Sequence, residues 1–218
     1  MAIMIANVLS DCVWKAVYRY APLPLNMALL HAIFPCLRGA SGAGIPKWEN
    51  EDAPWEILDV SKGEGVSGQI CRLIGGEGTI FIHPSAEVAE SALIEGPCYI
   101  GSNVEIRHGA YLRGGSWICD GAIVGNSSEI KNSILLPGAK APHFNYVGDS
   151  VIGANANLGA GVKLSNVRND RGMISVSLPS NKRVDTGLRK MGALVGDESQ
   201  IGCNTVTNPG SLIAPNSM

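Results

Sequence analysis

Two cationic side chains, Arg113 and Lys131, stand eighteen positions apart, and each directly follows a branched aliphatic residue. An arginine guanidinium can hold an oxyanion through two parallel hydrogen bonds, and a lysine ammonium adds a point charge. If the two side chains stack, their repulsion requires an anion or a carboxylate nearby. The pair therefore predicts either a phosphate-binding site or an ion-pair ladder with Glu95, which precedes Arg113 by the same spacing.

His143 stands twelve positions after Lys131, within the segment 141–146. An imidazole titrates near ~6.5, so it can serve as the general base for a nucleophile at neutral pH. A lone histidine is more often structural than catalytic. The residues by themselves leave both interpretations of His143 open.

These side chains need an element that stacks residues at this spacing, and the sequence contains a repeat of that kind. Branched aliphatic residues recur every six positions, at Ile82, Val88, Ile94, Ile100, Ile106, Leu112, Ile118, Val124, Ile130 and Leu136. The frame resumes at Tyr146 and again at Val195. A period of six fits neither an α-helix nor the alternation of a flat sheet. It is typical of a coil with three short faces, so we predict an all-β solenoid, a parallel β-helix of hexapeptide repeats.

The spacing divides the chain into three segments. We expect an N-terminal helical segment and linker over 1–50, a joining helix and lead-in over 51–78, and the β-helix over 79–218. Breaks in the period predict loops at 137–145 and 165–190, and departures from a repeat tend to hold function. Apolar residues at helical spacing over 1–38 predict a helical hairpin that caps the open end of the solenoid or meets a partner subunit.

Composition excludes several classes of protein. The chain has 17 basic and 19 acidic residues and a formal net charge of −2, so we expect no nucleic-acid binding. No apolar stretch reaches the ~18 residues of a membrane helix. The apolar start lacks the basic front and the cleavage site of a signal peptide, so we expect a cytoplasmic protein that does not bind a membrane.

Metal chemistry finds little support. The six cysteines are widely spaced and form no C-x-x-C pair, which argues against a zinc knuckle or a disulfide framework. A γ-type carbonic anhydrase would share the predicted prism, but it needs three zinc-binding histidines. Only four histidines exist, at His31, His83, His108 and His143, and His31 falls in the helical segment. We therefore predict no metal site.

The segment 129–166 resembles a known family over its whole length. It reads EIKNSILLPGAKAPHFNYVGDSVIGANANLGAGVKLSN, and the later run at 187–197 reads GLRKMGALVGD. Both are similar to the acetyltransferase half of bifunctional sugar-1-phosphate nucleotidylyltransferase/N-acetyltransferases, which make UDP-N-acetylhexosamines. The run PWEIL at 54–58 resembles the helix that joins the two halves, so the resemblance covers about residues 52–213.

The resemblance implies a fold and an activity. It implies a left-handed β-helix, a homotrimer with active sites between neighbouring prisms, and acetyl-CoA as co-substrate without a metal. The acceptor would be a hexosamine-1-phosphate, either glucosamine-1-phosphate or galactosamine-1-phosphate. His143 would be the general base for direct transfer of the acetyl group, while backbone N–H groups stabilise the tetrahedral oxyanion.

The resemblance also implies roles for single residues. Residues that match the sugar-phosphate ligands of the family are Arg113, Lys131, Tyr146, Asn157 and Asn166. Residues expected at the acetyl-CoA site are Ala160, Gly161, Arg189, Lys190 and Cys203, with Cys203 where the family usually has a serine.

The sequence departs from the family by lacking the nucleotidylyltransferase half, so we expect no uridylyl transfer and allow for a separate nucleotidylyltransferase partner.

Two alternatives to the implied activity stay open. One is another acyl- or acetyltransferase of the same fold that acts on a different amine or hydroxyl. The other is a non-catalytic trimeric scaffold or sugar-phosphate-binding subunit, which would not require a histidine at a break in the repeat.

Overall fold

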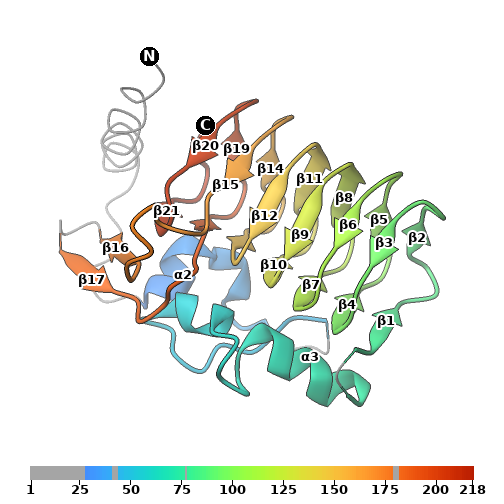
Figure 1. Ribbon diagram of the computed structural model, residues 1–218, viewed down its shortest axis with the longest axis horizontal. Coiled ribbons are helices and arrows are strands. Elements are labelled where there is room, and N and C mark those ends of the chain that lie inside the picture. The colour runs from blue at the N-terminus through green and yellow to red at the C-terminus, as the bar shows by residue number, and fades with distance from the viewer. Residues whose placement is uncertain (1–27, 41–43, 77, 179–181) are drawn as a thin grey trace.

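The computed structural model describes residues 28–40, 44–76, 78–178 and 182–218. From residue 80 onward these residues wind into a parallel β-helix, as the six-residue period predicts. The helix is left-handed, as the resemblance implies. Figure 1 shows the coils stacked side by side along the long axis of the molecule. The first helix of the predicted N-terminal hairpin falls within 1–27 and so lies outside the described residues.

Three parallel sheets form the three faces of the solenoid. The first contains β1 (Ile80–Ile82), β4 (Cys98–Ile100), β7 (Ser116–Ile118), β10 (Ser133–Leu135), β13 (Val151–Ile152), β18 (Ala193–Val195) and β21 (Ser211–Ile213). The second contains β2 (Glu87–Val88), β5 (Glu105–Ile106), β8 (Ile123–Asn126), β11 (Lys140–His143), β14 (Asn157–Leu158) and β19 (Gln200–Ile201). The third contains β3 (Leu93–Ile94), β6 (Tyr111–Leu112), β9 (Glu129–Lys131), β12 (Tyr146–Gly148), β15 (Lys163–Leu164) and β20 (Val206–Thr207).

The interior of the solenoid is a column of aliphatic side chains, one from each face of each coil. Six of the predicted inward residues are almost fully buried there: Ile100, Ile106, Leu112, Ile118, Val124 and Ile130. Burial of each such side chain contributes about 1.5–3 kcal/mol. The repeat therefore serves the core of the protein, and the outward positions between its members remain available for function.

The coil length changes in the middle of the solenoid. Cys98 pairs with Ser116 and Ser116 pairs with Ser133, so the second of these coils is one residue shorter than the first. The following coil has the same reduced length, since Ile134 pairs with Val151. The predicted break in the period between Leu136 and Tyr146 is therefore wrong, because each of these two coils is one residue shorter and no loop is inserted there.

The stretch 137–145, expected to be a loop, instead contains strand β11, which pairs with β8 and β14. The inward residues of this coil are Leu135, Ala141 and Val147, whereas Leu136 packs in a second cluster outside the solenoid. Tyr146 faces outward and is partly exposed. The register could not be predicted from Leu136 and Ala141, because side-chain type alone does not show which way each residue points.

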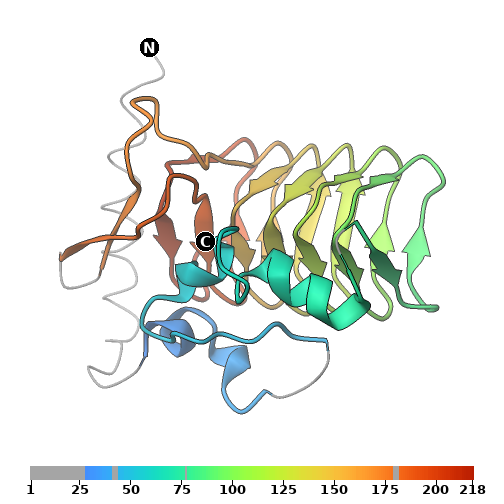
Figure 2. The same ribbon diagram turned by 60° about the horizontal axis from the view of Figure 1, so that its bottom comes forward.

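The segment before the solenoid covers the outer face of the first sheet. It contains α2 (Leu29–Ile33), η1 (Pro35–Leu37), η2 (Pro54–Leu58) and α3 (Val66–Ile74), which Figure 2 shows along one side of the coils. The indole Nε1 of Trp117 donates to the carbonyl of Gly44 at 3.1 Å, and Leu136 packs in the same apolar cluster. The described part of the predicted hairpin thus covers a side of the solenoid and not its open end, and its contact with a partner subunit stays a prediction.

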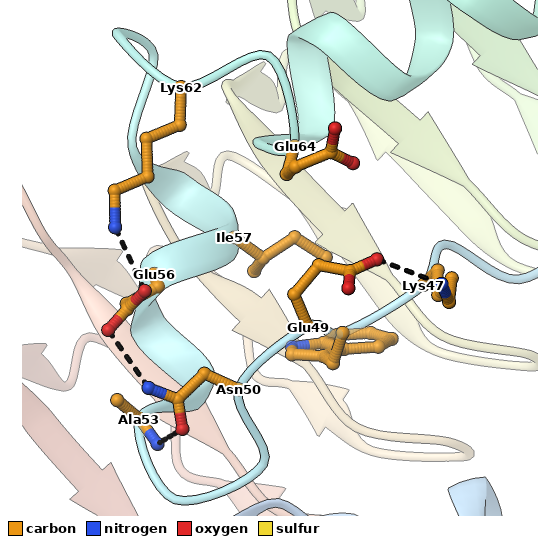
Figure 3. A pocket seen from close by; sticks show the side chains of 9 residues that line it. Lys47, Glu49, Asn50, Ala53, Glu56, Ile57, Lys62 and Glu64 are labelled. Carbon is orange, nitrogen blue, oxygen red and sulfur yellow. Dashed lines mark hydrogen bonds and ion pairs between the residues drawn. The ribbon is translucent and has the colours of Figure 1, made fainter.

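The joining segment encloses a small hollow of its own (Figure 3). Lys62 Nζ pairs with Glu56 Oε2 at 2.9 Å, and Asn50 Nδ2 donates to Glu56 Oε1 at 3.0 Å. Lys47 Nζ pairs with Glu49 Oε1 at 3.0 Å. These side chains hold the segment 47–62 together, and none of the predicted site residues lies among them.

The expected loop at 165–190 is an arm between β15 and β18. It contains the antiparallel strands β16 (Ser175–Ser177) and β17 (Arg183–Asp185), in which Val176 pairs with Val184. The solenoid continues beyond it without a gap, since Val151 pairs directly with Leu194. The arm therefore leaves the coil and returns to it at one corner (Figure 1).

Candidate functional site

Four polar residues share one corner of the solenoid, where the chain passes from the third sheet to the first. They end or follow the neighbouring strands β6, β9, β12 and β15, and they are Arg113, Lys131, Asp149 and Asn166. The backbone N–H of Asp149 donates to the carbonyl of Lys131 at 2.9 Å. We call this group the lysine corner. The stacking of Arg113 and Lys131 follows from parallel pairing of adjacent coils.

The two cations of the lysine corner each face a carboxylate. Arg113 Nη1 pairs with Glu129 Oε1 at 3.0 Å, and this bond raises the pKa of Arg113. Lys131 Nζ lies 3.1 Å from both carboxylate oxygens of Asp149. Glu95 accepts a hydrogen bond from the hydroxyl of Tyr111 at 2.9 Å. The ion pairs therefore run to Glu129 and Asp149, and not to Glu95 as the ladder interpretation expected.

Tyr146 reaches the lysine corner along the outer surface of the third sheet. Asn166 Nδ2 donates to the Tyr146 hydroxyl at 3.2 Å and to Asp149 Oδ2 at 2.5 Å. Partial burial is the main cause that raises the pKa of Tyr146. A Cβ on Gly148 would lie 2.6 Å from the Tyr146 hydroxyl oxygen and 2.7 Å from Asn166 Nδ2. A glycine at 148 therefore leaves the space in which Tyr146 and Asn166 meet.

A second set of predicted residues shares the corner between the second and third sheets. The backbone N–H of Gly161 donates to the carbonyl of His143 at 2.9 Å, and the N–H of Asn204 donates to the carbonyl of Ala160 at 2.8 Å. We call His143, Ala160, Gly161 and Cys203 the histidine corner. The side chains of His143 and Cys203 are exposed there.

Three predicted residues lie apart from the groups assigned to them. Asn157 lies in β14 of the second sheet, where it pairs with Lys140 and Gln200. Arg189 donates through Nη1 to the carbonyl of Arg171 at 3.4 Å, and the residue after Lys190 hydrogen-bonds to the backbone of Asn166. Arg189 therefore contacts the arm between β15 and β18, and Lys190 precedes the residue that bonds to the backbone of Asn166. The predicted acetyl-CoA residues are thus not gathered at one corner.

The two corners stand at opposite edges of the third sheet. Between them lies an open hollow of about 400 Å³, lined by Tyr146, Lys163, Ser165, Asn166 and Val167. The hollow opens outward, so a ligand in it would contact one face of this chain and leave its other side uncovered. Asn166 is the residue of the lysine corner that lines the hollow, and the cation in its lining is Lys163, whose Nζ donates to the carbonyl of Gly161 at 2.7 Å.

Sequence reasoning missed Glu129, Asn132 and Asp149. Asp149 stands eighteen positions after Lys131, as Lys131 does after Arg113. That spacing does not place Asp149, because the coil between them has seventeen residues and Gly148 is the residue that pairs with Lys131. Glu129 gave no signal either, because a glutamate before an inward aliphatic residue is common on the surface of this sequence.

Among the residues that the structure describes, no three side chains of His, Cys, Asp or Glu gather in a way that would hold a metal ion. Within the same residues, no helix is long and apolar enough to cross a membrane. The longest described helix, α3, has nine residues.

The three-sheet solenoid with a six-residue period defines a hexapeptide-repeat β-helix protein. A family model described as the GMPPB C-terminal domain matches residues 96–217, which is more than half of the chain. The chain belongs to this family.

Two curated relatives match most of the chain. A bifunctional sugar-1-phosphate nucleotidylyltransferase/acetyltransferase of Sulfurisphaera tokodaii is 35% identical over 173 residues, which cover 76% of this chain and 43% of the relative. The bifunctional protein GlmU of Methanococcus aeolicus is 32% identical over 176 residues, which cover 78% of this chain and 42% of the relative. The chain thus spans less than half the length of these relatives, and it is similar to their acetyltransferase half.

Proposed function

We propose that the protein is an acetyl-CoA-dependent N-acetyltransferase that acts on a hexosamine-1-phosphate. The observation that carries this proposal is the lysine corner, where Arg113 and Lys131 stack on adjacent coils and Lys131 shares Asp149 with Asn166. Asn166 and Tyr146 in turn line an open hollow. Two cations with nearby amide and hydroxyl groups suit a phosphate monoester on a sugar ring. The acetyltransferase names of the relatives support the same activity.

His143 is the general base of the proposed reaction. The amino group of the sugar is largely protonated at neutral pH, and the imidazole removes one proton from it. The free amine attacks the thioester carbonyl of acetyl-CoA, and backbone N–H groups stabilise the tetrahedral oxyanion. When the intermediate collapses, the C–S bond breaks, and the thiolate of coenzyme A takes the proton from the imidazolium. The nitrogen that attacked the carbonyl releases its second proton to solvent, which leaves the neutral amide.

The proposed active site is completed by a second copy of the chain. Within one chain the lysine corner and the histidine corner lie at opposite edges of the third sheet, and the hollow between them is open on its outer side. In a cyclic homotrimer the histidine corner of one subunit would face the lysine corner of its neighbour. The sugar phosphate would then bind to one subunit while the base comes from the next.

The product of this reaction is an N-acetylhexosamine-1-phosphate. A nucleotidylyltransferase would consume it, and the names of the bifunctional relatives combine both activities in one chain. We propose that a nucleotidylyltransferase acts on the product of this reaction.

The test is the release of free thiol from acetyl-CoA in the presence of glucosamine-1-phosphate or galactosamine-1-phosphate. We expect turnover with one of the two sugars, and we expect His143→Ala to lower kcat by about 10²–10⁴-fold, the usual contribution of a general base. His108→Ala is the matched control. His108 stands on the same edge of the solenoid, and its Nδ1 lies 2.7 Å from Ser91 Oγ.

Three outcomes would contradict the proposal in different ways. Equal losses in His143→Ala and His108→Ala would show that His143 is not the base. Full activity of His143→Ala would reject the mechanism and keep the enzyme class. No thiol release with either sugar by a folded trimer would favour another acceptor or a non-catalytic scaffold.

A further inference from the structure

Asp149 joins three of the polar side chains around the lysine corner. Its Oδ1 accepts from Lys131 Nζ at 3.1 Å and from Asn132 Nδ2 at 2.9 Å, and its Oδ2 accepts from Asn166 Nδ2 at 2.5 Å. The Asp149 side chain is only 3% exposed, whereas that of Lys131 is 20% exposed. A carboxylate this deeply buried does not reach a ligand in the hollow, but Asn166, which it holds, lines that hollow, and the partly exposed Lys131 shares the same carboxylate.

The backbone fixes the position of this carboxylate. Asp149 has a φ of +47°, in the left-handed region that aspartate and asparagine tolerate better than most residues. Its carbonyl accepts from the N–H of Gly192 at 2.8 Å. Asn132 Nδ2 also donates to the carbonyl of Leu58 at 2.9 Å, at the end of η2. Contacts with the returning chain and with the joining segment therefore hold Asp149 in place.

The contacts determine how Lys131 and Asn166 can serve a ligand. A lysine ammonium has three N–H donors, and Lys131 turns toward Asp149 while its partial exposure leaves donors for an anion. Asn166 uses its amide nitrogen on Asp149 and on the Tyr146 hydroxyl. Within the described residues nothing donates to its side-chain carbonyl oxygen, which is left to accept from an amine or hydroxyl of the sugar.

We propose that Asp149 is a positioning residue that holds Lys131 for the phosphate and Asn166 for the amino sugar. The proposal rests on the proposed function, because it assigns Asp149 to the same sugar-phosphate site. Asp149 acts through its two neighbours. Its negative charge beside Lys131 by itself weakens phosphate binding, so its benefit lies in geometry.

The variant Asp149→Asn separates geometry from charge. It preserves size and tolerates the positive φ, but one carbonyl oxygen replaces two carboxylate oxygens, and the new N–H₂ faces donors. If Asp149 positions its neighbours, the affinity for the hexosamine-1-phosphate falls about 10–100-fold, as for loss of hydrogen bonds to a charged group. If Asp149 acts only through charge, the affinity rises, and that result overturns the inference.

Asp197→Asn is the matched control. Asp197 is also a buried carboxylate at a solenoid corner, but it accepts from the backbone N–H groups of Cys36 and Ala154, both at 2.8 Å, far along the chain from Lys131. We expect it to lower the melting temperature without changing sugar-phosphate affinity. Equal affinity losses in the two variants would mean a general effect on the fold and would overturn the inference.

The measurement is calorimetric titration of the full chain with glucosamine-1-phosphate and galactosamine-1-phosphate, without acetyl-CoA. Wild type that binds neither probe overturns the proposed function and this inference together. If the wild type binds one probe, but no more tightly than Asp149→Asn does, the inference is overturned and the proposed function is not. If Asp149→Asn does not fold, Asn132→Gly removes one donor to Asp149 and retains the φ of +44° found at this position. A loss of about threefold to tenfold is then expected, and an unchanged affinity overturns the inference.

Discussion

At the residue scale, Phe144 occupies a conformation that suits a different side chain. Its φ is +52°, and the residues with the same conformation at this corner of the solenoid include Ser127, Gly161 and Asn204. A left-handed conformation costs an ordinary side chain roughly 1–2 kcal/mol. Phe144 is also 58% exposed, so burial within its own chain does not offset this cost.

We therefore expect Phe144→Asn to stabilise the isolated chain by about 0.5–1 kcal/mol, because asparagine tolerates this conformation better. For a chain of this size the melting temperature would rise by about 1–4 °C. Urea denaturation and a thermal melt check the expectation. Destabilisation would show that the ring of Phe144 is buried against something outside its own chain, such as the neighbouring subunit next to His143.

At the element scale, strand β11 decides how the chain runs past His143. The side chain of Ala141 is fully buried in the solenoid interior, next to the exposed Lys140 on the same strand. A loop would tolerate a larger residue at position 141, whereas the interior of a coil would not. The side chain that fits at this position thus distinguishes the two descriptions of the segment 137–145.

We expect Ala141→Leu to destabilise the protein by about 1–3 kcal/mol, since extra methylene groups in a filled core force shifts of backbone and side chains. Lys140→Ala is the control and should stay within about 0.5 kcal/mol of wild type. Chemical denaturation followed by circular dichroism measures both. A neutral Ala141→Leu would mean that this stretch is the loop that the period predicted.

At the scale of the whole molecule, the question is whether one chain contains a complete site. The lysine corner and the histidine corner lie at different edges of the prism, separated by the width of the third sheet. A homotrimer would join them across each interface. Two variants that are inactive by themselves can test this, because each would retain the corner that the other has lost.

We expect His143→Ala and Lys131→Met to be inactive separately and active after they are unfolded and refolded together in equal amounts. Random trimers would place an intact histidine corner against an intact lysine corner at about one interface in four, so about a quarter of wild-type activity should return. Thiol release from acetyl-CoA measures it. No recovery by mixed trimers would place the whole site within one chain.

The sequence by itself determined the fold class, because an aliphatic residue every six positions can be buried only in a coil with three faces. The spacing of one full coil then brought Arg113 and Lys131 together, and the resemblance pointed to Tyr146 and Asn166 beside them. Parallel strands transmit register directly from one coil to the next. The spacing therefore retained its meaning wherever the coil length was constant.

Only the tertiary structure decided the rest. Because two coils are each one residue shorter, Leu136 lies outside the interior and Ala141 lies inside it. Neither side chain is large or polar enough to show in the sequence which way it points. Asp149 and Glu129 joined the lysine corner because neighbouring coils pack them there. The separation of His143 from that corner depends on where each residue falls around the prism. Such positions depend on the register between neighbouring coils. The loss of one residue from a coil shifts that register for every strand that follows.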